Sequence, residues 1–485
     1  MTTIIEDNAS HTGGARDDLV LIRGNNVFAD GAGGNDWLSA QLYRQTAAGL
    51  SLSTSLTGGA GHDYLMASLG LEGEPEDFDI PLSLSATLDG GAGNDSIWAD
   101  FNSAYADQFA NVDAGDGDDR ITVRQDYHAE YNGINETHRS ESTVLAGNGD
   151  DVISVLLREG GHTGVADGGV GALSTVHGSG GADRITSDVH SGSGPEAENF
   201  LYGGDGDDEI SAIAYAGADW GGGPAYNRVR GGEGDDRIEM EAGSDEKTST
   251  NSATGDAGND TISALGRVHW GSAYNDLSGG DGDDRLSARI ETSDYDDNMA
   301  FNAVNKIDGG EGDDRITGVV SIGGSIVETG EFRSELYGRE GDDTITARGG
   351  FDNILAGNQG DDTLRGSGST DRLIGGQGAD VLRGGGGEDE FVFKGTRGEA
   401  SERDRVADFS QGEDRFDISA IDANVFRGGN QAFTFLPGRG PLRHLRHRRQ
   451  CLPRRQPGLH LRRRNRHRPR MGGRRPERQR QPAPR

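Results

Sequence analysis

The aspartates of one recurrent six-residue turn are the side chains of this chain whose type and spacing could do chemistry. The turn reads Gly-Gly-x-Gly-x-Asp, for example Gly203-Gly-Asp-Gly-Asp-Asp208 and Gly309-Gly-Glu-Gly-Asp-Asp314. Carboxylates and backbone carbonyls are the ligands that Ca²⁺ prefers, and glycine permits the positive φ and the close backbone approach that turn carbonyls toward an ion. Each copy is therefore predicted to supply part of a calcium site.

The aspartate at position six is present in all sixteen copies of the turn. Position four is glycine in every copy except at Ser369, and position one is glycine except at Ala114 and Ala146. One such turn could be an ordinary hairpin turn, but sixteen copies with the aspartate at one offset favour a metal site. The predicted metal ligands are Asp36, Asp63, Asp95, Asp119, Asp151, Asp183, Asp208, Asp236, Asp260, Asp284, Asp314, Asp343, Asp362, Asp371, Asp380 and Asp389.

Two further positions of the repeat indicate strands around a thin interior. A large apolar residue stands two positions after each aspartate, and an aliphatic residue stands two positions before the turn in fourteen copies. These residues are expected to anchor short strands, while the small polar residues between them face solvent. The acids at positions three and five, such as Asp205 and Asp207, are either outer-sphere ligands or solubilising charge, and we favour the second interpretation.

Over residues 30–393 these segments resemble the RTX nonapeptide, Gly-Gly-x-Gly-x-Asp-x-U-x, of the calcium-binding parallel β-roll family. The resemblance implies that the first six residues form an ion-binding turn and the last three a short strand. It also implies multiple Ca²⁺ ions, each between turns of successive coils. The predicted fold class is all-β, a parallel β-roll or β-solenoid repeat with calcium-bound turns.

The spacing of the aspartates predicts two kinds of coil. From Asp36 to Asp343 the aspartates are 24 to 32 residues apart, whereas from Asp362 they are nine apart. We predict a wide-coil solenoid over 29–350 with one calcium turn per coil, all on one edge. The alternative is a second, degenerate turn hidden in each spacer. A tandem nonapeptide roll over 351–393 should alternate its turns between two edges, and 1–28 is expected to be a leader or cap.

The segment after the repeats is similar to the C-terminal cap of serralysin-type metalloproteases. Its residues run Asp408-Phe-Ser-Gln-Gly-Glu-Asp-Arg-Phe-Asp-Ile-Ser419, with Phe416 and Ile418 replacing aliphatic residues of that pattern. A truncated cap is therefore expected over 394–438. Residues 439–485 hold 18 Arg and no Lys, and they form an aberrant Arg/Pro-rich tail. A reading-frame shift near codon 436 is the favoured explanation of this tail, and a disordered basic arm is the other.

Composition separates an acidic array from this tail. Residues 1–438 carry a net charge of −51 and the last 47 residues carry +17, so calcium is the natural counter-ion of the array. The only cysteine is Cys451, which excludes a disulfide framework and a cysteine-based zinc site. No apolar run long enough for a transmembrane helix and no ordinary N-terminal signal peptide is visible.

Catalytic signatures are missing from the sequence. It contains neither the His-Glu-x-x-His motif of zinc proteases nor the Gly-x-Ser-x-Gly elbow of lipases. We therefore predict a non-enzymatic, extracellular calcium-binding protein that folds on calcium and has a surface, matrix or adhesion role. Its expected partners are calcium ions and a cell-surface or matrix polysaccharide or protein, not nucleic acid, and the resemblance implies export by type I secretion machinery. The alternative is a polysaccharide-active β-solenoid enzyme of the epimerase or lyase kind.

Overall fold

The structure is a computed structural model. It describes residues 2–421 apart from 46–49, 73–81, 104–105, 128–138, 160–170, 193–195, 218–221, 294–300, 324–329 and 395–402. The Arg/Pro-rich tail and the second half of the expected cap therefore lie outside the described residues. Every regular element that the structure describes is a β-strand. No helix in this part of the chain is long and apolar enough to span a membrane.

The strands form two parallel sheets of seventeen strands each, and consecutive strands alternate between them. The first sheet contains β1 (Thr2–Ile5), β3 (Leu19–Ile22), β5 (Trp37–Gln45), β7 (Tyr64–Glu72), β9 (Ser96–Ser103), β11 (Arg120–Tyr127), β13 (Val152–Glu159), β15 (Arg184–Ser191), β17 (Glu209–Ala216), β19 (Arg237–Ser244), β21 (Thr261–Val268), β23 (Arg285–Thr292), β25 (Arg315–Ile322), β27 (Thr344–Gly349), β29 (Thr363–Arg365), β31 (Val381–Arg383) and β33 (Arg405–Val406). The second sheet contains β2 (Ser10–Thr12), β4 (Val27–Asp30), β6 (Ser51–Ala60), β8 (Leu82–Ala92), β10 (Ala106–Asp116), β12 (Ser140–Asn148), β14 (Ala172–Gly180), β16 (Ala197–Asp205), β18 (Ala225–Glu233), β20 (Ser249–Ala257), β22 (Ala273–Asp281), β24 (Ala303–Glu311), β26 (Phe332–Glu340), β28 (Asn353–Gln359), β30 (Asp371–Gln377), β32 (Glu390–Val392) and β34 (Arg415–Asp417).

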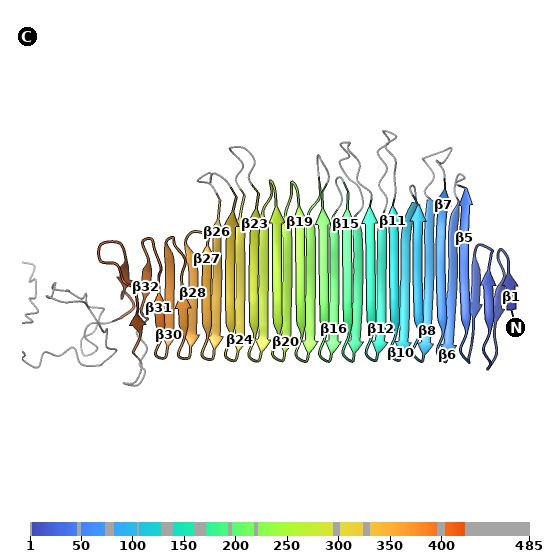
Figure 1. Ribbon diagram of the computed structural model, residues 1–485, viewed down its shortest axis with the longest axis horizontal. Coiled ribbons are helices and arrows are strands. Elements are labelled where there is room, and N and C mark those ends of the chain that lie inside the picture. Colours follow the sequence, from blue (N-terminus) through green and yellow to red (C-terminus); the bar gives the residue numbers. More distant parts are fainter. Residues whose placement is uncertain are drawn as a thin grey trace, which may run out of the picture. The chain divides into compact units, whose positions relative to one another are not determined.

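One strand from each sheet makes one coil of a solenoid. Each strand pairs in parallel with the strand two places later, so successive coils stack along one axis (Figure 1). The even-numbered strands run toward the edge that carries the short glycine-aspartate turns, and the odd-numbered strands run back from it. The predicted all-β parallel β-roll or β-solenoid class is confirmed.

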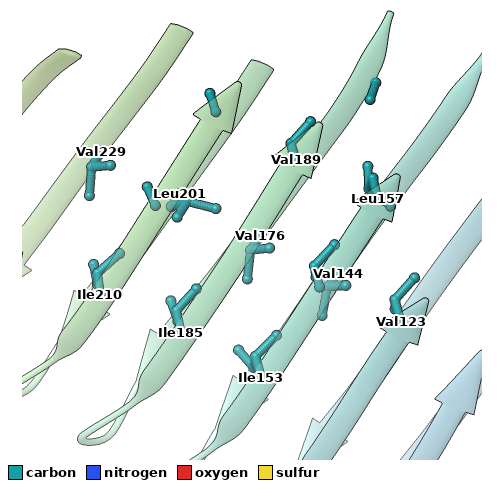
Figure 2. Packing of buried hydrophobic residues seen from close by; sticks show 14 of the residues in the cluster. Val123, Val144, Ile153, Leu157, Val176, Ile185, Val189, Leu201, Ile210 and Val229 are labelled. Atoms are coloured by element: carbon teal, nitrogen blue, oxygen red, sulfur yellow. The ribbon is translucent and has the colours of Figure 1, made fainter. Parts of the chain in front are cut away.

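The interior is one layer of apolar side chains between the two sheets. The residue two places after the aspartate of a glycine-aspartate turn, such as Ile153 or Ile185, points inward from the odd-numbered strands. The residue two places before the turn, such as Val144 or Val176, points inward from the even-numbered strands, and the two sets pack on each other (Figure 2). Alternation of the remaining side chains toward solvent follows from the two-residue period of a strand.

Register between coils is kept although the coils differ in length. The connection between β11 and β12 covers residues 128–139, whereas the connection between β21 and β22 covers only 269–272. Inward-facing residues nevertheless stay opposite their equivalents, as Val144 does to Val112 and Val176. The connections that differ in length are therefore those from an odd-numbered strand to the following even-numbered strand. A one-residue slip would turn every inward side chain to solvent, which explains the constant register.

The last described coil is closed by the segment around Phe409. Phe409 and Phe416 stack with ring centroids 4.3 Å apart and lie against Phe391, which is completely buried. The Asp408 carboxylate accepts the backbone N–H groups of Gly384 at 3.0 Å and Gly385 at 3.2 Å. This segment therefore covers apolar surface and satisfies backbone donors at the end of the coil stack.

Candidate metal site

Fourteen of the predicted aspartates form one hydrogen-bonded column, which we name the aspartate ladder. In each step the backbone N–H of one aspartate donates to Oδ1 of the aspartate in the next coil. Asp208 donates to Asp236 and Asp236 donates to Asp260, both at 2.8 Å. The ladder consists of Asp36, Asp63, Asp95, Asp119, Asp151, Asp183, Asp208, Asp236, Asp260, Asp284, Asp314, Asp343, Asp362 and Asp380.

The second carboxylate oxygen of every ladder aspartate is buried and has no hydrogen-bond partner among the residues that the structure describes. The side chains themselves are at most 3% exposed. A buried, unpaired carboxylate oxygen is strongly unfavourable, because the group has lost its water and gained nothing in exchange. A whole column of them indicates a group of opposite charge that belongs beside the ladder.

The glycine at position one, which is alanine at Ala114 and Ala146, lets this oxygen lie close to the backbone of the turn. A Cβ on Gly231 would stand 2.1 Å from Asp236 Oδ2 and 2.9 Å from the carbonyl oxygen of Gly255. A carboxylate oxygen and a carbonyl oxygen of the next coil therefore border the same small space. Both are hard oxygen donors of the kind that calcium takes.

Positions two and four of the turn take positive φ, and position four is glycine in every ladder turn. Gly232 and Gly234 both have φ of +130°, a region that residues with a Cβ rarely enter. A Cβ on Gly232 would also stand 1.8 Å from the carbonyl oxygen of Gly204 in the preceding coil. Position two nevertheless holds Ala32, Ser179, Asp256, Arg339 and Asn358 in five ladder turns, so only the glycine at position four is common to the whole ladder.

Burial without a counter-charge raises the pKa of the ladder aspartates. Loss of hydration is the main cause for Asp236, whose pKa rises to about 7, and the neighbouring carboxylates of Asp208 and Asp260 add to the rise. The N–H of Asp208 opposes it by stabilising the charged form. For Asp314 the same causes raise the pKa to about 8. The ladder thus holds protons near neutral pH unless a cation replaces them.

The other two predicted ligands lie at the opposite edge. Asp371 donates its N–H to Asp389 Oδ1 at 3.0 Å, and Asn353 Nδ2 donates to Asp371 Oδ1 at 2.6 Å. Asp362 and Asp380 belong to the aspartate ladder, so the nine-residue copies alternate between the two edges as their spacing predicts. Unlike the ladder residues, Asp371 has a partner on Oδ2, namely the backbone N–H of Ser367.

The column that contains Asp371 runs through Asn353 and Ser334 into the wide coils. There it consists of asparagines, which we name the asparagine ladder: Asn199, Asn227, Asn251, Asn275 and Asn305. Asn251 Nδ2 donates to Asn275 Oδ1 at 2.8 Å and to the Leu265 carbonyl of the facing strand at 3.0 Å. In the wide coils the strand runs on past this point, so no turn forms there. A neutral amide replaces the aspartate there, and its hydrogen bonds are made to neighbouring asparagines of the ladder and to the facing strand.

The alternative of a degenerate second turn in each spacer is not seen where the structure describes the whole connection. Residues 245–248 and 269–272 join strands at the opposite edge without a glycine-aspartate turn. Two residues that extend the column of the aspartate ladder and the column of Asp371 were not predicted from the sequence. Asp18 donates to Asp36 Oδ1 at 2.6 Å, and Asp389 donates to Asp414 Oδ1 at 3.1 Å. Asp18 and Asp414 could have been recognised by the apolar residue two places after each, although their turns lack the full set of glycines.

The position-five acids are exposed, as solubilising charge would be, and they also accept hydrogen bonds from the backbone. Asp235 is exposed, accepts the N–H of Asn259 on Oδ1 at 2.7 Å and donates its own N–H to Asp207 Oδ1 at 2.8 Å. These side chains therefore satisfy backbone donors of the stacked turns on the solvent side. The position-three acid Asp205 is exposed as well.

The aspartate ladder fits a hard divalent cation. Among the described residues, no three His, Cys, Asp or Glu side chains surround one point. An ion at this edge would therefore draw on backbone carbonyls as well as on the ladder carboxylates, which is the donor set that calcium accepts and that zinc does not favour.

Comparison with known proteins yields one family. The family described as Peptidase M10 serralysin C terminal matches residues 3–436. The match ends one residue before Pro437, where the arginine- and proline-rich composition begins. No curated protein and no solved structure matches the chain.

Proposed function

Since the chain belongs to the serralysin C-terminal family of Peptidase M10, we propose that it is a secreted calcium-binding repeat protein that folds on calcium outside the cell. The proposed ligands are all sixteen position-six aspartates. The aspartate ladder binds a line of Ca²⁺ ions along one edge, and Asp371 and Asp389 bind at the other. The proposed role is that of a surface, matrix or adhesion component.

The observation that carries this proposal is the column of buried, unpartnered Oδ2 atoms in the aspartate ladder. Calcium bound there supplies the missing counter-charge, and the chain supplies the carboxylates and the glycine positions that make room for the ion. Because the ladder exists only when the coils are stacked, binding energy becomes folding energy. Without calcium, mutual repulsion of the carboxylates opposes the stack, and the single apolar layer is thin.

Extracellular calcium suits such a switch. Modules outside the cell bind Ca²⁺ with dissociation constants of about 10⁻⁴–10⁻³ M, so sites of this class fill after export and stay empty before it. We propose that the chain leaves the cell unfolded through a type I system. Residues 1–438 contain no cysteine, which removes disulfide formation as an obstacle to that passage.

Far-UV circular dichroism of the full chain tests the proposal. The protein is first freed of calcium with a chelator, and titration with Ca²⁺ to millimolar concentration should then convert coil to β-structure. Mg²⁺ should not substitute for Ca²⁺, because it demands a smaller octahedral site. The variant Asp236→Asn with Asp260→Asn should need several-fold more calcium. The matched variant Asp235→Asn with Asp283→Asn removes the same charge from exposed position-five side chains and should titrate like the parent.

Two results would overturn the proposal. One is a chain that is equally rich in β-structure in chelator and in calcium. The other is an equal effect of the two variant pairs, since the ladder would then have no special part in binding. Product formation on uronate polymers would instead support the alternative of a polysaccharide-active enzyme.

A further inference from the structure

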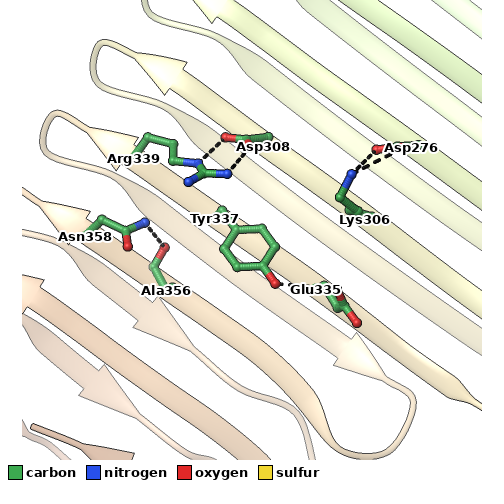
Figure 3. Close-up of polar contacts among 8 residues, drawn as sticks. All are labelled: Asp276, Lys306, Asp308, Glu335, Tyr337, Arg339, Ala356 and Asn358. Atoms are coloured by element: carbon green, nitrogen blue, oxygen red, sulfur yellow. Dashed lines mark hydrogen bonds and ion pairs between the residues drawn. The ribbon is translucent and has the colours of Figure 1, made fainter. Parts of the chain in front are cut away.

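The basic residues on the outer faces of the two sheets differ in whether they form ion pairs. On the even-numbered strands, every Arg or Lys from β18 to β34 within the described residues pairs with an acid. Arg339 pairs with Asp308 and Lys306 pairs with Asp276, on neighbouring strands (Figure 3). The other paired residues are Arg228, Arg230, Arg333, Arg372 and Arg415. The basic residues of this face are therefore neutralised by acids on the same face.

The odd-numbered strands β23 to β33 carry arginines without such partners, and we name this surface the arginine face. It consists of the exposed residues Arg285, Arg315, Arg348, Arg365, Arg383 and Arg405. In the described part of the chain none of these six forms an ion pair. The same strands hold one acid, Glu291, which pairs with Arg289 and Arg267. A chain segment of strongly negative net charge thus presents one positive surface.

The arrangement places like charges side by side. Arg285 lies opposite Arg315 on the neighbouring strand, and Arg365 lies opposite Arg383. Directly opposed like charges in a sheet are unfavourable. On the described strands of the opposite sheet no arginine or lysine lies opposite another in this way, and Lys306 lies between Asp276 and Glu335 of the neighbouring strands. The arginine face therefore has a charge pattern that folding alone does not favour and that an anionic partner would stabilise.

The dimensions and composition of the face define that partner. Five strand steps from β23 to β33 span roughly 24 Å at the spacing of a sheet. Hydroxyl groups of Ser287, Thr317 and Thr346 also point outward from these strands. Guanidinium groups bind carboxylates with paired hydrogen bonds, and hydroxyl groups bind sugar hydroxyls. Together they match a linear polymer of acidic sugars laid along the solenoid axis.

We propose that the arginine face binds an acidic polysaccharide, and this inference names a partner for the extracellular role proposed above. Single-stranded nucleic acid is a poorer match, because the odd-numbered strands from β23 to β33 contain no aromatic residue on which bases could stack. An anionic membrane is also a poorer match, because the face has no aromatic or leucine side chain directed outward to enter a lipid interface.

Fluorescence anisotropy with a short labelled hyaluronate chain tests the proposal on the full-length protein. The triple variant Arg315→Gln, Arg365→Gln and Arg383→Gln should bind at least tenfold more weakly than the parent. The matched variant Arg228→Gln, Arg339→Gln and Arg372→Gln loses the same charge from the even-numbered strands and should stay within about twofold. Neutral dextran, polythymidylate and phosphatidylglycerol vesicles serve as competing ligands.

The outcomes separate this proposal from the proposed function. Circular dichroism on the same samples reports whether the chain is folded, with and without calcium. A chain that folds on calcium but does not bind hyaluronate overturns the partner and leaves the calcium switch standing. Equal losses from the two triple variants overturn the arginine face as the site. Tighter binding to polythymidylate or to the vesicles overturns the choice of a polysaccharide.

Discussion

Replacement of Asn251 by alanine tests whether the asparagine ladder stabilises the wide coils. Asn251 is completely buried and takes part in three hydrogen bonds. Its Nδ2 donates to Asn275 Oδ1 at 2.8 Å and to the Leu265 carbonyl at 3.0 Å, and its Oδ1 accepts Asn227 Nδ2 at 2.9 Å. Alanine removes all three and leaves buried partners unsatisfied. At about 1–2 kcal/mol for each bond, the free energy of unfolding should fall by about 3–6 kcal/mol.

Urea unfolding in saturating calcium, followed by circular dichroism, measures this loss. Amide hydrogen exchange in β18 to β22 locates it, because in a repeat array the nearest coils should be affected most. The control is Ser252→Ala on the same strand, whose side chain faces outward and should change stability by less than about 0.5 kcal/mol.

A small effect would refute this reasoning. If Asn251→Ala changes unfolding by less than about 1 kcal/mol and leaves exchange in β18 to β22 unaltered, the amides do not stabilise the stack. The ladder would then be a consequence of close packing between the coils, without a role in holding them together.

Three further predictions concern the turns and the tail. Gly234→Ala should destabilise the calcium-bound protein by more than about 2 kcal/mol, because its φ is +130° and a Cβ would stand 2.3 Å from the Gly206 carbonyl oxygen. Urea unfolding in saturating calcium measures this loss, and Gly266→Ala should be tolerated in the same assay, since its Cβ would meet ordinary contacts at 3.4 Å or more. In chelator, acidification from above pH 8 to about pH 5.5 should favour folding. Burial raises the pKa of Asp236 to about 7 and of Asp314 to about 8, so the folded state binds more protons and its stability falls as the pH rises through these values. Circular dichroism showing less structure at the lower pH would contradict this. Finally, another reading frame after codon 436 of the gene should restore Gly/Asp-rich cap sequence, and DNA sequencing that finds none would exclude a frame shift.

Local sequence predicted the turn and its neighbours well. A glycine with positive φ, an aspartate at a constant offset and an apolar residue two places on are features of a few consecutive residues, so a pattern such as Gly231 to Ile238 can be recognised without knowing its surroundings. Asp18 and Asp414 were not recognised in the sequence, because their turns keep the aspartate and the apolar residue but lack some of the glycines.

The rest depended on contacts between coils. Asn251 contacts Asn227 and Asn275, each 24 residues away, and in the solenoid as a whole this interval varies from coil to coil. No fixed period therefore marks the asparagine ladder in the sequence. The arginine face is hidden for the same reason, because Arg365 and Arg383 become neighbours only when β29 and β31 pair.

By itself, the sequence determined that this chain is a β-solenoid built on aspartate turns, because turn geometry is encoded within single repeats. Only the tertiary structure decided that asparagines replace aspartate at the edge opposite the aspartate ladder, and that within the described residues six arginines on one face form no ion pair. Those features arise from the stacking of coils of unequal length, which brings together residues whose separation in the sequence follows no rule.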